Sequence, residues 1–271
     1  MTPAQPASLR DTLGLRRGEM VAFVGAGGKT TTLIRLLVEL RAAGRTVLTT
    51  STVHLFELKG VTPHPFVVED DLAVLQAQLP SLLAEAGHVR VAAERIRIDK
   101  IRGLDPGQVA ALKGLPGLDH LLVEADGARH RSLKAPAPHE PALPAGVDVL
   151  LIVTGLDAIG RPLDEAHVHR LEQVMAITGL AAGALVTPGA VAQVLTSPAG
   201  GMKGVAPATR CWVVATKYTP ATAAVARELA AAVLAAGIPQ IAGVILLGPA
   251  PIDELAGAPL VALTAGSGSG A

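Results

Sequence analysis

Short apolar runs alternate with helical patterns along most of the chain. Continuous apolar runs that end at glycine or polar residues predict strands buried on both faces, as in a parallel sheet covered by helices. The expected strands are Met20–Val24, Thr46–Ser51, Phe66–Val68, His88–Ala92, a run from His120, Val147–Val153, Cys211–Ala215 and Ile241–Leu247. The expected helices are Leu33–Ala43, Asp70–Ala86, Asp105–Leu112, a segment after Asp164 with His167 and His169 near its start, and a segment from Pro220 to Gly237. We therefore expect an α/β fold of three layers, a mostly parallel sheet with helices on both faces.

Boundary residues refine this pattern. Gly44 and Gly237 have the character of helix-ending glycines, and Pro80 is expected to break or kink its helix. Residues before Glu19 are interpreted as a short lead-in. With 271 residues, we expect residues 1–265 to form one domain and Gly266–Ala271 to be a flexible tail.

A glycine loop follows the first expected strand and leads into a helix. Glycines let consecutive backbone N–H groups point at one anion, and a helix start adds further donors and a positive dipole. A phosphate chain is the natural ligand for such a loop, and the loop indicates a fold like that of P-loop NTPases. The residues expected to bind the nucleotide phosphates are Gly25, Ala26, Gly27, Gly28, Lys29, Thr30 and Thr31. Lys29 would lie in a solvent-facing loop and reach the terminal phosphates, and Thr30 would ligate Mg²⁺.

The spacing of this loop is unusual. The standard P-loop is G-x-x-x-x-G-K-[ST], whereas Gly25 and Gly28 enclose only Ala26 and Gly27. NAD binding is disfavoured, because Thr30 stands where a dinucleotide fingerprint needs its third glycine. The alternative, a plain turn between strand and helix, does not explain a lysine followed by three threonines.

Two carboxylates end the strand that begins at His120. Hydrolysis of a nucleoside triphosphate needs a carboxylate close to Mg²⁺ and the attacking water. Glu124 and Asp126 are therefore candidate catalytic and metal-binding residues together with Lys29 and Thr30. The alternative is an ordinary polar turn.

A loop rich in proline and cations follows these carboxylates. Prolines stiffen the chain, which suits a preset binding loop. Arg129, Arg131, Lys134 and His139 are candidates for holding an anionic substrate. A rigid connector without a ligand is the alternative.

Four other segments leave alternatives open. The threonine-rich run Thr49–His54 contacts the nucleotide or metal, or reflects β propensity and turn chemistry. The charged residues alternating between Glu94 and Arg102 form a solvated strand edge or a basic patch for substrate. His167 and His169 are two residues apart and would not share a helical face, which disfavours a metal site; His169 or Arg170 could instead contact substrate. Gly200–Gly204 is a mobile substrate loop or a linker.

Composition excludes some classes of function. Lysine plus arginine and aspartate plus glutamate both total 23, and aromatic residues make up only 2% of the chain. Neither a basic field nor a base-stacking platform is expected, so we expect no nucleic-acid partner. The single cysteine, Cys211, and a polar N-terminus without an apolar signal segment favour the cytoplasm. The uncharged stretch Leu229–Ile252 is broken by Gly237, Pro239 and Gly243, so we expect no membrane span.

Several motifs together resemble the YqeC-like proteins. They are Val24-Gly-Ala-Gly-Gly-Lys-Thr-Thr31, Thr49-Thr-Ser-Thr52, Val123-Glu-Ala-Asp-Gly-Ala128, Leu133-Lys-Ala-Pro136, His139-Glu-Pro141, Gly155-Leu-Asp-Ala158 and Val168-His-Arg170. The resemblance implies an accessory factor in the maturation of selenium-dependent molybdenum hydroxylases and in selenium cofactor biosynthesis, with a hydroxylase or its maturation proteins as partners. It also implies a P-loop NTPase-like fold.

The identity of the base stays open between ATP and GTP. Related sequences carry Asn-Lys-x-Asp at the late strand end, where this chain has Thr216-Lys217-Tyr218-Thr219 and lacks the Asp that grips guanine. Lys217 is still expected to stack along a purine. The short loop also resembles that of the ATP-dependent Mur and folylpolyglutamate ligases, although no C-terminal domain of the size that they use is evident.

Three hypotheses follow from these features. The first is an enzyme that hydrolyses ATP or GTP with Mg²⁺. The second is a binding protein gated by a nucleotide that it does not hydrolyse. The third is a ligase or transferase that uses ATP on a small anion held by the proline-rich loop.

Overall fold

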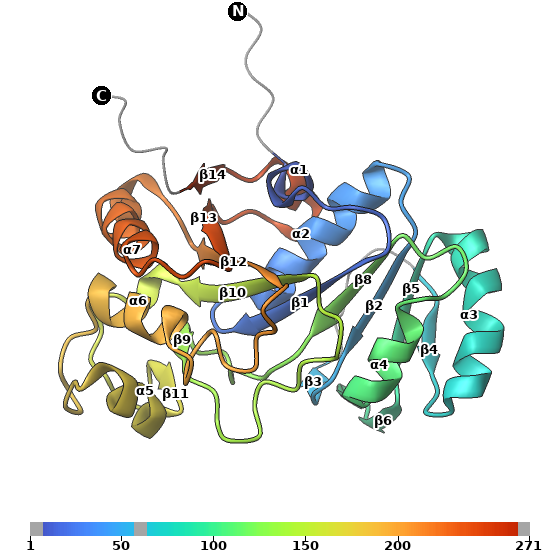
Figure 1. Ribbon diagram of the computed structural model, residues 1–271, viewed down its shortest axis with the longest axis horizontal. Coiled ribbons are helices and arrows are strands. Elements are labelled where there is room, and N and C mark those ends of the chain that lie inside the picture. The colour runs from blue at the N-terminus through green and yellow to red at the C-terminus, as the bar shows by residue number, and fades with distance from the viewer. Residues whose placement is uncertain (1–7, 57–63, 265–271) are drawn as a thin grey trace, which may run out of the picture.

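The computed structural model describes residues 8–56 and 64–264, and within them nine strands form one sheet in the order β14-β13-β12-β10-β1-β8-β2-β5-β4 (Figure 1). Neighbouring strands are parallel, except that β13 and β14 are antiparallel. The strands are β1 (Glu19–Gly25), β2 (Val47–Ser51), β4 (Phe66–Val68), β5 (His88–Ala92), β8 (His120–Glu124), β10 (Val149–Gly155), β12 (Arg210–Thr216), β13 (Ile241–Leu247) and β14 (Leu260–Leu263). β1 therefore lies near the middle of the sheet, between β10 and β8.

Helices cover both faces of this sheet. They are α1 (Leu9–Leu13), α2 (Lys29–Ala42), α3 (Leu72–Ala86), α4 (Pro106–Leu112), α5 (Leu171–Thr178), α6 (Pro188–Thr196) and α7 (Ala223–Ala235), with 3-10 turns η1 (Leu156–Ala158), η2 (Pro220–Thr222) and η3 (Ile252–Gly257). Alternate residues of β1 face opposite layers: Phe23 packs in a cluster with α1 and α2, whereas Ala22 packs with α6 and α7. Met20, on the same face as Ala22, packs in a cluster with α3 and α4. The expected three-layer α/β fold is confirmed.

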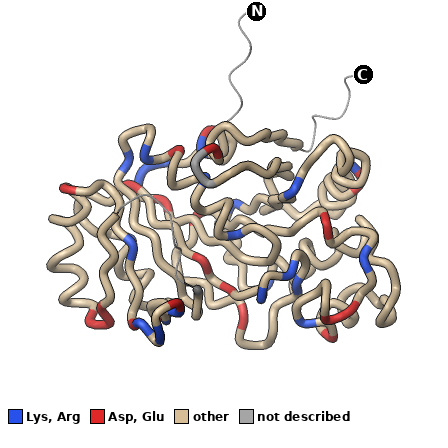
Figure 2. The backbone as a smooth tube through the Cα atoms, turned by 180° about the vertical axis from the view of Figure 1, so that it is seen from behind, with Lys and Arg blue, Asp and Glu red and all other residues tan. Residues whose placement is uncertain are grey.

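Two small sheets flank the main one. β3 (Leu55–Phe56), β7 (Lys100–Arg102) and β6 (Glu94–Arg97) form an antiparallel sheet, in which β6 is exposed throughout. The charged segment is therefore a hairpin with a solvated outer strand, which agrees with the first of the two alternatives given for it. Figure 2 shows lysine and arginine interspersed with aspartate and glutamate along the described backbone.

The second small sheet corrects one expectation. β9 (Leu133–Lys134) pairs in parallel with β11 (Val168–His169), so His169 is in a strand, His167 lies in the turn before it, and α5 begins only at Leu171. The prediction of a helix holding both histidines was wrong, because pairing with the proline-rich loop overrides local propensity.

Other boundaries also differ from the sequence expectation. The segment before Glu19 contains α1, whose Leu9 and Leu13 are buried against α2, so it is more than a lead-in. α3 runs through Pro80 without a break. The extent of one domain over residues 1–265 stays a prediction, and the expected tail Gly266–Ala271 lies outside the described residues. In the part of the chain that the structure describes, no helix is long and apolar enough to cross a membrane.

Candidate functional site

The glycine loop joins the end of β1 to the start of α2. Gly25, Gly27 and Gly28 have φ angles of 95°, 75° and 139°, which L side chains rarely adopt. A Cβ atom at Gly25 would lie 2.2 Å from the Val153 carbonyl oxygen, and one at Gly27 would lie 2.6 Å from the Gly155 nitrogen. Glycine is therefore required both by the backbone conformation and by the close approach of β10.

The start of α2 is open to an anion. Its N-cap residue is Gly28, which supplies no side-chain cap, and its first turn contains no acidic residue. The first N–H groups of a helix have no intrahelical acceptor, and the helix dipole adds positive potential there. The loop and helix start thus present the donors that a phosphate group needs.

Lys29 is buried, which corrects the expectation that it lies in a solvent-facing loop. Its side chain is 4% exposed, and its Nζ donates to the Gly25 carbonyl oxygen at 2.6 Å. The same nitrogen lies 3.0 Å from Asp126 Oδ1 and 3.8 Å from Glu124 Oε1. β8 places both carboxylates beside β1, so the three sequence-predicted catalytic residues are brought together.

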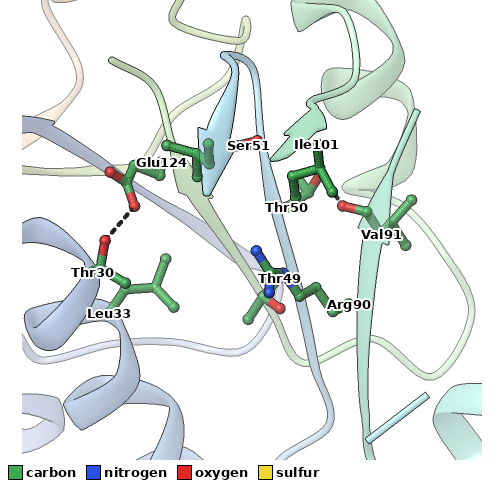
Figure 3. Close-up of a pocket in the computed structure, with 10 residues that line it drawn as sticks. Thr30, Leu33, Thr49, Thr50, Ser51, Arg90, Val91, Ile101 and Glu124 are labelled. Atoms are coloured by element: carbon green, nitrogen blue, oxygen red, sulfur yellow. Dashed lines mark hydrogen bonds between the residues drawn. The ribbon is translucent and has the colours of Figure 1, made fainter. Parts of the chain in front are cut away.

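Thr30 and Glu124 form the part of the site that fits a magnesium ion. Thr30 Oγ1 donates to Glu124 Oε2 at 3.0 Å (Figure 3). Burial raises the pKa of Glu124, while Lys29 and the Thr30 hydroxyl act in the opposite direction. No group of three or more His, Cys, Asp or Glu residues suited to a metal occurs in the described ranges. One hydroxyl and one carboxylate are enough for Mg²⁺, because this ion takes most of its ligands from water and phosphate.

Asp126 contacts the backbone of the glycine loop and two lysines. Its Oδ2 accepts from the Gly25 N–H at 2.9 Å and lies 3.1 Å from Lys134 Nζ. Asp126 is thus bound to two lysines and the loop backbone, which makes it a residue that positions Lys29. Its direct part in metal binding stays a prediction.

Lys134 is one of the four expected substrate-binding residues, and the structure places it in an internal ion-pair network. Its side chain is 1% exposed; Nζ lies 3.1 Å from Glu140 Oε2 and donates to the Gly127 carbonyl at 2.6 Å. Arg170 lies 3.5 Å from the other Glu140 oxygen. Burial alone would raise the pKa of Glu140, but the Ala137 N–H, Lys134 and Arg170 lower it to about 2. Glu140 and Arg170 were not expected to interact, because no sequence spacing connects them.

The remaining three candidates of this loop lie nearer the surface. Arg129 and His139 are exposed, and Arg131 is half-buried with its Nε donating to the Glu165 carbonyl at 2.8 Å. The loop is also tied to Gly200–Gly204, since Lys203 Nζ donates to the Ala137 carbonyl at 2.6 Å. The role of these residues in substrate binding stays a prediction.

A small pocket lies on the β2 side of the Thr30–Glu124 pair (Figure 3). It has room for about 30 Å³, and its wall includes the threonine-rich end of β2 and Arg90. The hydroxyls of that run contact protein groups: Thr49 Oγ1 lies 2.9 Å from His88 Nε2, and Thr50 Oγ1 donates to the Val91 carbonyl at 3.0 Å. These contacts favour a structural role for Thr49 and Thr50. They do not fill the pocket, which lies beside the Glu124 carboxylate.

A second pocket lies on the opposite side of the glycine loop, at the ends of β12 and β13. It has room for about 230 Å³. Lys217 lines it in a left-handed conformation with φ of 62°, and its Nζ bonds Asp157 Oδ2 at 2.6 Å and Ser132 Oγ at 2.8 Å. These contacts fix the lysine stem beside the pocket, and stacking of a purine along it stays a prediction.

Comparison with known proteins agrees with these motifs. The family described as YqeC protein matches residues 21–172. The "Uncharacterized protein YqeC" of Escherichia coli (strain K12) is 34% identical over 201 residues, which are 74% of this chain and 77% of that protein. Among solved structures, chloroplast FtsY from Physcomitrella patens matches with a TM-score of 0.41 and 14% identity, over 94% of this chain and 66% of the FtsY chain. The expected family is confirmed by the family match and the Escherichia coli relative: the chain belongs to the YqeC family.

Proposed function

We propose that the chain binds a nucleoside triphosphate with Mg²⁺ at the glycine loop and hydrolyses it, as an accessory factor in selenium or molybdenum cofactor maturation of a hydroxylase. One observation carries the chemical part of this proposal: the uncapped start of α2, which consists of Lys29 and Thr30, lies directly beside Glu124. The cellular role and the hydroxylase partner rest on the YqeC family resemblance alone.

Each residue of the site has a distinct part in this proposal. The loop N–H groups and Lys29 neutralise phosphate charge, with Lys29 exchanging part of its contact with Asp126 for a phosphate oxygen. Thr30 and Glu124 would hold Mg²⁺, which when bound would neutralise phosphate charge. Glu124, whose pKa is raised by burial, would also accept a hydrogen bond from the attacking water.

The test is a hydrolysis assay on the purified chain with Mg²⁺ and either ATP or GTP. We expect turnover in the wild type and a loss of at least about a hundredfold in Glu124→Gln, as for removal of a general base. The matched control is Glu228→Gln, at an exposed glutamate on α7. Equal rates in wild type and Glu124→Gln would contradict the proposal.

The ion-pair network supports a second candidate, a nucleotide-gated binding protein. Lys29 contacts Asp126, Asp126 contacts Lys134, and Lys134 contacts Glu140 in the proline-rich loop. A phosphate that draws Lys29 away from Asp126 would therefore leave Asp126 paired with Lys134 alone, and so would change the ion pairs that hold the proline-rich loop. Nucleotide binding without turnover, with altered hydrogen exchange in residues 128–144, would favour this candidate.

A third candidate is a ligase or transferase, with a small acid bound at the pocket of Figure 3 beside Thr30 and Glu124, where a phosphoryl group would be transferred. The pocket has room for only about 30 Å³, about one water molecule, so its walls would have to move apart to admit the acid. Turnover of ATP only after an acid or amine is added would favour this candidate.

We also place the protein in the cytoplasm, in keeping with the lone Cys211, whose thiol pKa is raised by burial to about 12.

A further inference from the structure

The second pocket, with room for about 230 Å³, extends from the glycine loop along one face of α2. Gly28 and Thr31 line it at the helix start, and Arg35 lines it one turn beyond Thr31. Lys217, at the end of β12, and Leu255, from η3, form other parts of its wall. The pocket is thus continuous with the expected phosphate site and has apolar as well as polar surface, as a base and ribose require.

Arg35 is the unusual residue of this pocket. Its side chain is 2% exposed, and Nε donates to Glu39 Oε1 at 3.0 Å. Its two terminal nitrogens, Nη1 and Nη2, are buried and have no hydrogen-bond partner among the described residues. Buried donors are normally paired, and leaving a charged donor unpaired is costly. Glu39 holds one edge of the guanidinium, while the two terminal nitrogens lack an acceptor at a residue that lines the pocket, so a ligand that reaches them would supply the missing acceptors.

The distance along the helix suits a nucleotide. Arg35 follows Lys29 by six residues in the sequence, which corresponds to about 9 Å along the helix axis. A phosphate at the helix start and a base edge at Arg35 can therefore belong to one nucleotide, which makes Arg35 a candidate base-reading residue.

We infer that Arg35 reads the O6 and N7 acceptors of a 6-oxopurine, so that the site prefers GTP to ATP. This inference rests on the proposed nucleotide site. A guanidinium fork matches two adjacent acceptors, O6 and N7. Adenine keeps N7 but presents the N6 donor in place of O6, so it would leave one terminal nitrogen of Arg35 unpaired and facing another donor. No carboxylate is among the described residues that line the pocket, and Thr216–Thr219 lacks the Asp that would bind the 2-amino group of guanine. Inosine, which has O6 and N7 but no 2-amino group, should therefore bind as well as guanosine.

The test compares three nucleotides on the full chain. Affinities of non-hydrolysable GTP, ITP and ATP analogues are measured with Mg²⁺, alongside inorganic tripolyphosphate. We expect GTP and ITP to agree within about threefold and ATP to bind about tenfold to a hundredfold more weakly, as for loss of a bidentate pair.

Variants at Arg35 assign the preference to this side chain. Arg35→Met should bring the ratio of GTP to ATP affinity close to one, and Arg227→Met, at an exposed arginine on α7, should leave it unchanged. Arg35→Lys keeps a cation beside Glu39, so it should fold even if Arg35→Met does not, and it should also reduce the ratio because one ammonium group cannot reproduce the fork.

The outcomes separate this inference from the proposed function. Equal binding of all three nucleotides, a preference that survives Arg35→Lys and Arg35→Met, or rejection of ITP would overturn the base-reading role and leave the phosphate site standing. Failure of every nucleotide and of tripolyphosphate to bind would overturn both.

Discussion

The burial of Lys29 gives a prediction about stability as well as affinity. Lys29→Ala removes the cation that lies 3.0 Å from Asp126 and 3.8 Å from Glu124. Removing one member of a buried ion pair costs about 3–5 kcal/mol of unfolding free energy. Asp126 keeps Lys134 at 3.1 Å and the Gly25 N–H at 2.9 Å, so the uncompensated charge falls mainly on Glu124. We therefore expect a loss near the lower end, about 3 kcal/mol at pH 8.

This loss should depend on pH. The pKa of Glu124 is already raised above its ordinary value of 4.5, mainly by burial, and Lys29 acts to lower it. A group with a raised pKa in the folded state binds its proton more tightly there than in the unfolded chain. Stability then falls as pH rises from about 4.5 through the folded-state pKa. Without Lys29 that pKa rises further, so the deficit of Lys29→Ala should be small near pH 5 and grow toward pH 8.

Urea unfolding of wild type and Lys29→Ala from pH 5 to pH 8 measures this deficit, and the same samples serve for nucleotide titration. Combining Lys29→Ala with Glu124→Gln is the control, because the neutral amide should remove most of the pH dependence. A variant as stable as wild type at pH 8 would refute the reasoning about the buried pair. Unchanged nucleotide affinity would refute the phosphate role of Lys29.

Three further predictions concern residues around the same site. Thr30→Val should lose the Mg²⁺ dependence of nucleotide binding while Thr30→Ser retains it, as measured by titration with and without the ion. Gly28→Ala should weaken nucleotide binding in the same assay, because its Cβ would lie 2.8 Å from Thr216 Cγ2 at a φ of 139°. Burial, followed by nearby cations, lowers the pKa of His88 from 6.5 to about 3, so stability should fall as pH drops through that window. His88→Asn should reduce that fall in urea unfolding.

Much of the fold follows from local pattern. The apolar runs that become β1, β8, β10, β12 and β13 were predicted because each is buried on both faces, which leaves a continuous apolar signature. The glycine loop was predicted for a related reason, since Gly25, Gly27 and Gly28 each need a conformation that other residues avoid. Both signals lie within a few consecutive residues.

The features that sequence missed depend on contacts between distant segments. Lys29 is buried only because β8 brings Glu124 and Asp126 beside it, and Lys134 is buried only because Asp126 and Glu140 flank it. β11 forms by pairing with β9, which local propensity near His169 does not reveal. From the sequence, Arg35 cannot be distinguished from any other arginine in a helix. Only the fold shows that its terminal nitrogens are buried beside the second pocket.

The central claim is that the glycine loop binds the phosphates of a nucleotide, and calorimetric titration tests it most directly. The wild-type chain is titrated with non-hydrolysable ATP and GTP analogues, with and without Mg²⁺, beside Thr30→Val, which leaves Lys29 and its ion pairs in place. We predict binding of one nucleotide that strengthens with Mg²⁺ in the wild type and loses that dependence in the variant. Absence of binding for both nucleotides in a folded wild-type chain would contradict the account.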